Sequence, residues 1–381
     1  MSVLWQTNNI SRTWPPCGVL TAITRRILAR RAEKSVQEEE IIIGFDALYN
    51  SEGKCAKGVC RKASVGRFHL FRMDEILKLQ KELATGTYKA RPTIKVRITY
   101  PKPRTAVANG FRDRVYQRSL NDNAVYPAMT RSFIRQNAAC QTGKGTDWAR
   151  EQVKLMIERE YRQHGADGYV LLVDIRHYYD TMPHDVANRC FERHLPPSVH
   201  NRVREVLDRQ YTGEAGYNPG SQMVQLAGIS VPDPIDHYIK ERLRAKKYVR
   251  FMDDSLIIHH DKAQLEEWRE AIRARYAADG MELHPTKTKI VRLKDGFRFL
   301  GFIYRLTPAG KVVMTVDPQN VKAERKRLFR LAQLIKAGEK PASALYEQYG
   351  SWKAHAAKGN SQQLLQRMDQ YVKTLLEGIT T

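Results

Sequence analysis

The sequence predicts an α+β protein, in which short antiparallel strands alternate with helices and a helical tail follows. Three observations predict this class. Short apolar or alternating segments are bounded by turn residues, at 88–104, 169–174, 248–259 and 291–306. Longer segments place apolar residues at helical spacing, as in 145–163 and 262–279. From residue 319 to residue 378 the chain shows successive helical patterns.

The charge of the chain indicates a polyanionic partner. Its 381 residues contain 64 Lys and Arg against 41 Asp and Glu, a formal net charge of +23. This excess is larger than a small-molecule enzyme needs, and it points to nucleic acid or an anionic membrane. A hydrophobic content of 42% excludes a wholly disordered chain. No apolar run of the sequence approaches the ~20 residues of a membrane-spanning helix, so we expect no membrane partner.

Residues 1–65 are predicted to be a basic N-terminal extension. Residues 1–32 carry five arginines, and no acid precedes Glu33. A mitochondrial transit peptide would share this pattern, but nothing else in the sequence indicates an organelle. We favour a basic helix that lies on RNA, or translation from a start codon upstream of the true one. Five scattered cysteines are typical of free thiols in a reducing compartment, and we expect a cytoplasmic protein.

The first half of the chain is predicted to be helical around one pair of strands. Apolar residues recur at helical spacing in 66–86, 111–130 and 145–163. Within 88–104, Ile94, Val96 and Ile98 alternate with polar residues, as paired strands do. From residue 88 to residue 150 the chain holds 13 Lys and Arg against three Asp, net +10 over 63 residues. Charge this dense indicates a groove that follows a phosphate backbone.

The second half carries strands that end in acids. Residues 169–174 form a short buried strand that ends at Asp174, and residues 248–259 form two strands that meet at Met252–Asp254. Another strand pair surrounds Phe299–Gly301. Helices are predicted at 183–209, 224–245, 262–279, 319–337, 341–357 and 360–378. The segment 224–245 is interrupted by prolines.

Three aspartates are placed where their charge needs compensation. Asp174 ends an apolar strand, and Asp253 with Asp254 lies at the turn between two strands. Burying carboxylates together costs free energy unless a partner compensates them. Mg²⁺ prefers carboxylate oxygens and leaves positions for substrate phosphates. In a basic protein this set indicates two-metal phosphoryl or nucleotidyl transfer. The alternative, favoured for an isolated Asp-Asp pair, is structural acids paired with arginine.

Seven motifs in order resemble those of reverse transcriptases, over roughly residues 65 to 381. The acidic motifs are Val173-Asp174-Ile175-Arg176-His177-Tyr178-Tyr179 and Phe251-Met252-Asp253-Asp254, which resembles the Tyr-x-Asp-Asp box. The others are Pro101–Arg104 with Phe111–Val115, Gly220–Gln225, His284–Thr288, Phe299–Phe302, and Tyr349–His355 followed by Asn360-Ser361. In the motif at 220–225, Val224 stands where the family's Gly-x-x-x-Ser-Gln box has Ser.

The resemblance implies a right-hand polymerase and RNA-directed DNA synthesis. It implies fingers at 66–165, a palm at 166–315 with an antiparallel, RRM-like sheet and part of the fingers interleaved, and a helical thumb at 316–381. The implied partners are an RNA template, a DNA or RNA primer and dNTPs. The implied cofactor is Mg²⁺, as two ions, with Mn²⁺ as an alternative.

The resemblance also assigns roles around the acids. Asp174 and Asp253 would hold the two ions, with Asp254 in support and the Ile175 carbonyl as a further ligand. Lys287 would be the general acid that protonates the leaving pyrophosphate. The alternative for Lys287 is one more basic surface residue.

Other residues would contact the substrates. Tyr179 is the implied steric gate, because an aromatic ring beneath the sugar excludes a 2′-hydroxyl. The alternative is core packing for Tyr178 and Tyr179, or one ring for each role if they alternate on a strand. Gly220 would let the backbone approach the new base pair. Gln225 would bond near the templating nucleotide, or else cap a helix. The implied phosphate clamps are Lys102, Arg104 and Arg114.

The motif that ends at Gln225 indicates a subtype. Its Gly-x-x-x-Val-Gln pattern is nearer the box of diversity-generating retroelement enzymes than the Gln-Gly-x-x-x-Ser-Pro of intron-type members. Phage-defence enzymes and template-independent DNA polymerases are alternatives, followed by group II intron maturases and a non-catalytic RNA-binding scaffold. We expect a bacterial or phage-encoded enzyme, with a structured non-coding RNA or a small accessory protein as a further partner.

Overall fold

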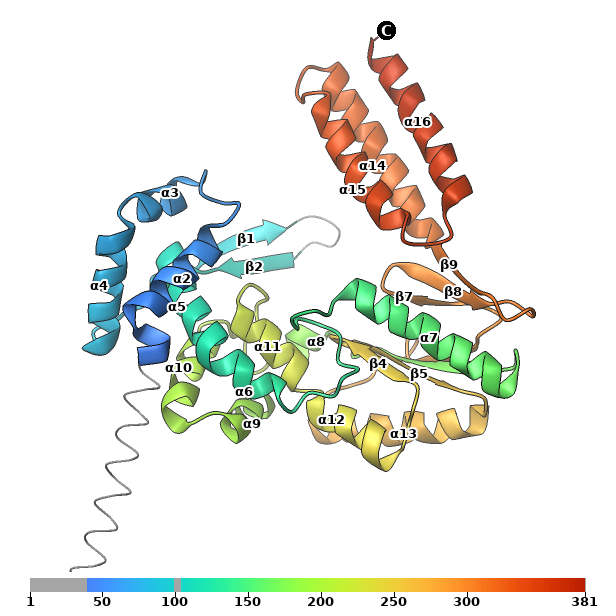
Figure 1. Cartoon of the computed structure of the whole chain (residues 1–381), viewed down its shortest axis with the longest axis horizontal. Helices are drawn as coiled ribbons and strands as arrows, with labels where there is room; N and C mark the ends of the chain where they lie inside the picture. The colour runs from blue at the N-terminus through green and yellow to red at the C-terminus, as the bar shows by residue number, and fades with distance from the viewer. Residues whose placement is uncertain (1–39, 99–103, 381) are drawn as a thin grey trace, which may run out of the picture. The chain divides into compact units, whose positions relative to one another are not determined.

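The computed structural model describes residues 40–98 and 104–380, which divide into two compact units (Figure 1). Unit 1 comprises the described residues up to Ala128 together with Leu195–Val206, and unit 2 comprises Met129–His194 and the chain from Leu207 onward. The N-terminal prediction for residues 1–39 lies outside the described residues, as does the predicted site residue Lys102.

Unit 1 is mainly helical. Its helices are α2 (Phe45–Ala56), α3 (Ala63–Leu70), α4 (Arg72–Ala84), α5 (Phe111–Leu120), the π-helical turn η1 (Asn121–Val125) and most of α10 (Pro197–Asp208). The single helix predicted over 66–86 is wrong, because the chain leaves helical geometry at Phe71, with φ −102° and ψ 32°. The buried carboxylate of Glu52 in α2 contacts Arg72 at 2.6 Å and His69 at 3.0 Å, which ties the helices on either side of this break together.

Unit 1 contains a strand pair, as predicted, but its second strand lies almost wholly beyond the predicted range of 88–104. Strands β1 (Ile94–Ile98) and β2 (Arg104–Ala108) pair antiparallel, with Val96 opposite Ala106. The apolar side chains of this hairpin are not buried: Ile94 is 63% exposed and Val96 is 45% exposed. Its basic residues Lys95 and Arg97 are exposed too. The hairpin therefore offers both apolar and cationic side chains to solvent.

The centre of unit 2 is a four-stranded antiparallel sheet in the order β4-β5-β3-β6. Its strands are β3 (Tyr169–Val173), β4 (Tyr248–Phe251), β5 (Asp254–His259) and β6 (Lys289–Arg292). Helices α7 (Thr146–His164) and α13 (Lys262–Ala278) cover opposite faces of this sheet (Figure 1). On the α7 face, Val153 and Ile157 pack in one core with Val170, Leu256 and Ile258. The predictions of β3, β4, β5 and both helices are confirmed, whereas β6 was not predicted as a separate strand.

The remaining elements of unit 2 surround this sheet. Helical segments include α8 (Tyr178–Thr181), α9 (His184–His194), α11 (Gln222–Ser230), α12 (Asp233–His237) and the π-helical η2 (Tyr238–Arg242). Residues 183–209 are helical as predicted, in two helices with a break after His194, and the predicted helical segment 224–245 is interrupted around its prolines, as the sequence indicated. A short helix, α6 (Tyr126–Thr130), spans the boundary in sequence between the two units.

A second sheet and a helical bundle complete unit 2. The sheet contains β7 (Phe297–Phe299), β8 (Phe302–Leu306) and β9 (Val312–Val316), of which β9 was not predicted. The predicted helical tail is confirmed as α14 (Pro318–Lys336), α15 (Ser343–Ala356) and α16 (Gln362–Thr380). The α+β class with antiparallel sheets is confirmed. Within residues 40–98 and 104–380, no helix has the length and apolar character needed to span a membrane.

A buried ion pair joins several elements of unit 2. Arg250 on β4 and Asp236 on α12 are both fully buried, and their closest N–O distance is 2.6 Å. The hydroxyl of Tyr248 donates to the same carboxylate at 2.6 Å. The guanidinium also donates to the carbonyl of Ile229, in α11, at 2.9 Å, and to that of Met252, in the β4–β5 turn, at 3.0 Å. One cation thus connects two helices and a hairpin.

We predict that Asp236→Asn lowers the free energy of unfolding by about 3–5 kcal/mol, because it leaves the buried Arg250 charge uncompensated. Urea denaturation followed by tryptophan fluorescence measures the loss. Lys262→Ala is the matched control: it removes an exposed pair with Glu266 at 3.1 Å and should cost about 1 kcal/mol or less. Equal losses in the two variants would contradict the prediction.

Candidate active site

The sheet register brings Asp174 level with Asp254. Strands β3 and β5 are antiparallel, and Val173 lies opposite Ser255. One further step along both strands places Asp174 opposite Asp254, because antiparallel partners move in opposite directions along the chain. The two acids therefore meet where the ladder ends, as the sequence predicted for a strand-end acid and a turn acid.

The β4–β5 turn places Asp253 beside them. Phe251 pairs with Asp254, so the turn consists of Met252 and Asp253. Met252 has φ 59°, a left-handed conformation that costs a non-glycine residue about 1–3 kcal/mol. Its carbonyl accepts the hydrogen bond from the buried Arg250 guanidinium at 3.0 Å. The same buried cation that holds the core therefore also fixes the turn that carries Asp253.

Negative charge is concentrated at this end of the sheet. Burial, together with the charges of Asp253 and Asp174, raises the pKa of Asp254 to about 7. Burial, with the charge of Asp174, also raises the pKa of Asp253. The Lys287 ammonium lies 3.1 Å and 2.9 Å from the two carboxylate oxygens of Asp174 and opposes both shifts. One ammonium thus faces three carboxylates.

The loop before β6 positions Asp174 through its backbone. The Asp174 N–H contacts the hydroxyl oxygen of Thr288 at 3.2 Å, and the Asp174 carbonyl accepts from the backbone N–H of His284 at 2.8 Å. Lys287 belongs to the same loop. The predicted His284–Thr288 motif is therefore packed directly against the first acidic motif.

The donor set fits a hard divalent cation in its chemistry. Mg²⁺ takes carboxylate oxygens, and the raised pKa values of Asp253 and Asp254 reflect burial first and repulsion between the carboxylates second, both of which such a cation offsets. In the described part of the chain, the ligand atoms of the three aspartates do not all lie within 4.8 Å of one another. The structure therefore gathers the three acids at one end of the sheet without clustering their oxygens that tightly.

The side chains of Tyr178 and Tyr179 lie in different environments, but this does not come from alternation along a strand. They lie in the helical turn α8 and not on a strand, so alternation between strand faces is wrong. Tyr178 is buried, and its hydroxyl donates to the carbonyl of Gly228 at 2.8 Å. Tyr179 is only partly buried, and a Cβ on Gly228 would lie 2.6 Å from its hydroxyl oxygen. Gly228 in α11 therefore makes room for the Tyr179 side chain.

The Gly220–Gln225 motif opens helix α11. The hydroxyl of Ser221 accepts from the Val224 N–H at 3.2 Å and caps the helix. Val224 is fully buried, which explains why an apolar residue fits where the resembled box has Ser. Gly220 and Gln225 are exposed. The capping alternative for Gln225 is wrong, since Gln225 lies inside the helix and Ser221 is the cap.

The other predicted site residues are spread over both units. Ile175 is 2% exposed and forms a bridge with Leu283 in unit 2. Arg104 opens β2 in unit 1. Arg114 lies in α5 of unit 1, with its guanidinium carbon 5.2 Å from the centre of the Phe111 ring. Lys102 lies outside the described residues.

The C-terminal bundle of unit 2 carries a basic groove. A pocket of about 1250 Å³ lies along α14 and α16, and its basic lining residues are Lys322, Arg325, Lys326 and Arg367. Aromatic side chains of Phe329 and Tyr371 line it as well. Cations interleaved with aromatic rings suit a nucleic-acid backbone and its bases.

Several residues that shape the site were not found from the sequence. Arg250 and Asp236 carry no local signal, because their pairing depends on the tertiary structure. Gly228 carries a weak sequence signal, since a glycine inside a helical pattern is often there because a neighbouring side chain packs against it. Thr288 stood in a recognised motif, but its contact with the Asp174 backbone could not be foreseen.

Comparisons with known proteins identify a family for this chain. The family model described as reverse transcriptase (RNA-dependent DNA polymerase) matches residues 102–304, more than half of the chain. Protein YkfC of Escherichia coli (strain K12) is 24% identical over 270 residues, which cover 60% of this chain and 70% of that protein.

Among solved structures, telomerase from Candida albicans in complex with the TWJ fragment of telomeric RNA matches with 11% identity and a TM-score of 0.45. The match covers 76% of this chain and 55% of that chain, so this chain spans about half the length of that structure. The range matched by the family model includes the three aspartates and Lys287. The chain therefore belongs to the reverse transcriptase family, the RNA-dependent DNA polymerases.

Proposed function

We propose that this chain copies RNA into DNA by two-metal nucleotidyl transfer, as an enzyme of the diversity-generating type. The observation that carries the proposal is the meeting of Asp174, Asp253 and Asp254 at one end of the sheet, with Lys287 against Asp174. The Gly220–Gln225 motif favours the diversity-generating subtype. The buried position of Val224 accounts for its departure from the family pattern.

Each acid has a proposed role. Asp174 and Asp253 would hold two Mg²⁺ ions, with Asp254 and the Ile175 carbonyl in support and Mn²⁺ as an alternative metal. Such ions, when bound, lower the pKa of the primer 3′-hydroxyl and neutralise charge on the triphosphate. The Lys287 ammonium, already beside Asp174, would donate a proton to the leaving pyrophosphate.

The substrate contacts follow the same reasoning. Tyr179 would lie beneath the sugar of the incoming dNTP, while Gly220 and Gln225 would face the new base pair. The clamps on phosphate would be Lys102, Arg104 and Arg114. The division into fingers at 66–165, palm at 166–315 and thumb at 316–381 belongs to this proposal, as does a structured RNA or accessory protein partner.

A primer-extension assay tests the proposal. An RNA template with an annealed primer, dNTPs and Mg²⁺ should give full-length complementary DNA. Omitting the template should abolish the product. Addition without a template would favour a template-independent polymerase, and RNA binding without any addition would favour a scaffold.

We predict that Asp174→Asn or Asp253→Asn reduces nucleotide addition by at least about 10³-fold, since metal-assisted charge stabilisation is worth several kcal/mol. RNA binding should survive, because phosphate contacts come from Lys and Arg elsewhere. Single-turnover primer extension and filter binding measure the two effects. Asp295→Asn, at an exposed acid, is the control and should act like the wild type. Polymerisation near the wild-type rate in either acidic-motif variant would refute the assignment.

We predict that Tyr179→Ala raises the efficiency ratio of rNTP to dNTP incorporation by about 5- to 150-fold, because steric overlap costs about 1–3 kcal/mol. Steady-state incorporation of matched nucleotides measures this ratio. Tyr178→Phe keeps a ring in the core and loses only its hydrogen bond to Gly228, so its ratio should stay unchanged. An unaltered ratio in Tyr179→Ala would mean that another residue is the gate.

We predict that nucleic-acid affinity falls steeply with salt. If about five phosphates are neutralised, log affinity should fall against log salt with a slope of about −3.5 to −4.5. Replacing Lys95, Arg97, Lys102 and Arg104 together should flatten the slope and weaken binding to all sequences alike. The control replaces Arg269 and Arg273, which already pair with Glu270. A quadruple variant with the full slope, yet without preference for one RNA, would contradict a general phosphate grip.

A further inference from the structure

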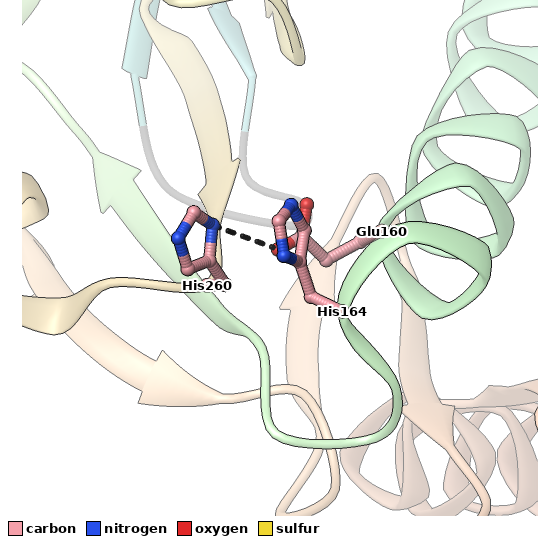
Figure 2. A group of neighbouring side chains, drawn as sticks. All are labelled: Glu160, His164 and His260. Atoms are coloured by element: carbon pink, nitrogen blue, oxygen red, sulfur yellow. Dashed lines mark ion pairs between the residues drawn. The ribbon is translucent and has the colours of Figure 1, made fainter.

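A second cluster of metal-ligating side chains lies in unit 2, away from the aspartates. Glu160 and His164 stand four residues apart near the end of α7, so they share one face of that helix. His260 follows directly after β5. Figure 2 shows the three side chains turned toward one another. Their potential ligand atoms all lie within 4.8 Å, and theirs is the one group of three His, Cys, Asp or Glu in the described chain that meets this condition.

Glu160 points to a ligand because its carboxylate is buried and half satisfied. The side chain has no exposed surface. Its Oε2 accepts from the Lys247 ammonium at 2.5 Å. Its Oε1 has no hydrogen-bond partner among the described residues, and the nearest imidazole nitrogen, Nδ1 of His260, lies 3.9 Å away. A buried carboxylate oxygen without a hydrogen-bond partner is costly, so a bound cation would stabilise it.

We propose that Glu160, His164 and His260 bind one divalent transition-metal ion of the Zn²⁺ class. Two imidazoles and one carboxylate are a set that such ions favour, whereas Mg²⁺ favours oxygen ligands alone. Both histidines are exposed, and their rings stack with centres 3.8 Å apart. Binding one ion requires these exposed rings to leave their stacked arrangement and turn their nitrogens toward Oε1 of Glu160. Three protein ligands leave a fourth position open to solvent.

Lys247 has a defined part in this site. It holds Oε2 of Glu160, and it also donates to the side chain of Gln163 at 2.6 Å. It therefore orients the carboxylate in the manner of an outer-shell partner and leaves Oε1 for the metal. Lys247 and both histidines line a pocket of about 540 Å³, and Arg244 and Lys246 line it as well. Their charge repels a cation, so affinity must come from the ligands and not from the surrounding field.

The proposed site is distinct from the aspartates. Asp254 begins β5 and His260 follows its last residue. At about 3.3 Å per residue, the strand separates the two by roughly 20 Å. A metal ion here would join the end of α7 to the end of β5. It would therefore stabilise the packing of helix on sheet, without touching the residues proposed for catalysis.

Metal binding to the untagged full-length chain tests the proposal. The protein is stripped with a chelator and dialysed to equilibrium against Zn²⁺ with Mg²⁺ in large excess. We expect one tightly held Zn²⁺ per chain. His164→Ala and His260→Ala should each weaken binding by at least about tenfold, because losing even an outer-shell partner costs 10- to 100-fold. Zn²⁺ should raise the melting temperature of the wild type and not of these variants.

Two control variants show whether the bound Zn²⁺ occupies this site. His259→Ala removes the neighbouring imidazole, whose Nδ1 lies 3.1 Å from the backbone nitrogen of Asp261, and should leave Zn²⁺ binding unchanged. Asp253→Asn should also leave it unchanged. Tight binding that survives in His164→Ala and His260→Ala, or that is lost in Asp253→Asn, would overturn the proposal, as would the absence of tight binding to the wild type. The readout is binding, so it stands whether or not the chain polymerises DNA.

Discussion

The buried charge of Arg250 is the constraint on which the candidate active site depends. A fully buried guanidinium needs a carboxylate and partners for its remaining hydrogens. Asp236 supplies the first, and the carbonyls of Ile229 and Met252 supply the others. The backbone of Arg250 is tied to a further segment, because its carbonyl accepts a hydrogen bond from the N–H of Ala138 at 2.9 Å. Helix α11, helix α12 and the acidic turn are thus held at one point, and the left-handed Met252 is held with them.

Much of this arrangement could be predicted from the sequence, and the limits are physical. Strand β3, the β4–β5 hairpin and the helices on either side of the sheet follow from local periodicity, and the order of the acidic motifs follows from the chain itself. The break at Phe71 could not be found, because helical spacing continues across it. The pairing of Arg250 with Asp236, and of His260 with Glu160, joins different elements and leaves no periodic trace. The exposure of Ile94 and Val96 could not be predicted either, because the alternation of apolar and polar residues does not tell whether another element packs on the hairpin.

Charge is distributed unevenly in this chain. The net charge of the whole chain and the local charge at the end of the sheet have opposite signs and serve different purposes. The net charge of +23 acts over distance and draws a polyanion toward the surface. At the end of the sheet the sign is reversed, with three carboxylates and one ammonium from Lys287. A polyanion held by the basic surfaces would meet its own sign there, unless cations accompany it. The long-range attraction and the local acidity therefore fit together only in the presence of metal ions.

The close approach of Tyr179 to Gly228 has an evolutionary consequence. Tyr179 belongs to the first acidic motif and Gly228 to helix α11, beyond the Gly220–Gln225 motif, yet the hydroxyl of the tyrosine occupies the space where a side chain at the glycine would begin. A side chain added at Gly228 would therefore force the Tyr179 ring to move. Among relatives that keep this packing, a methyl group at the glycine position should accompany a smaller side chain at the tyrosine position. The two sites should therefore vary as a pair.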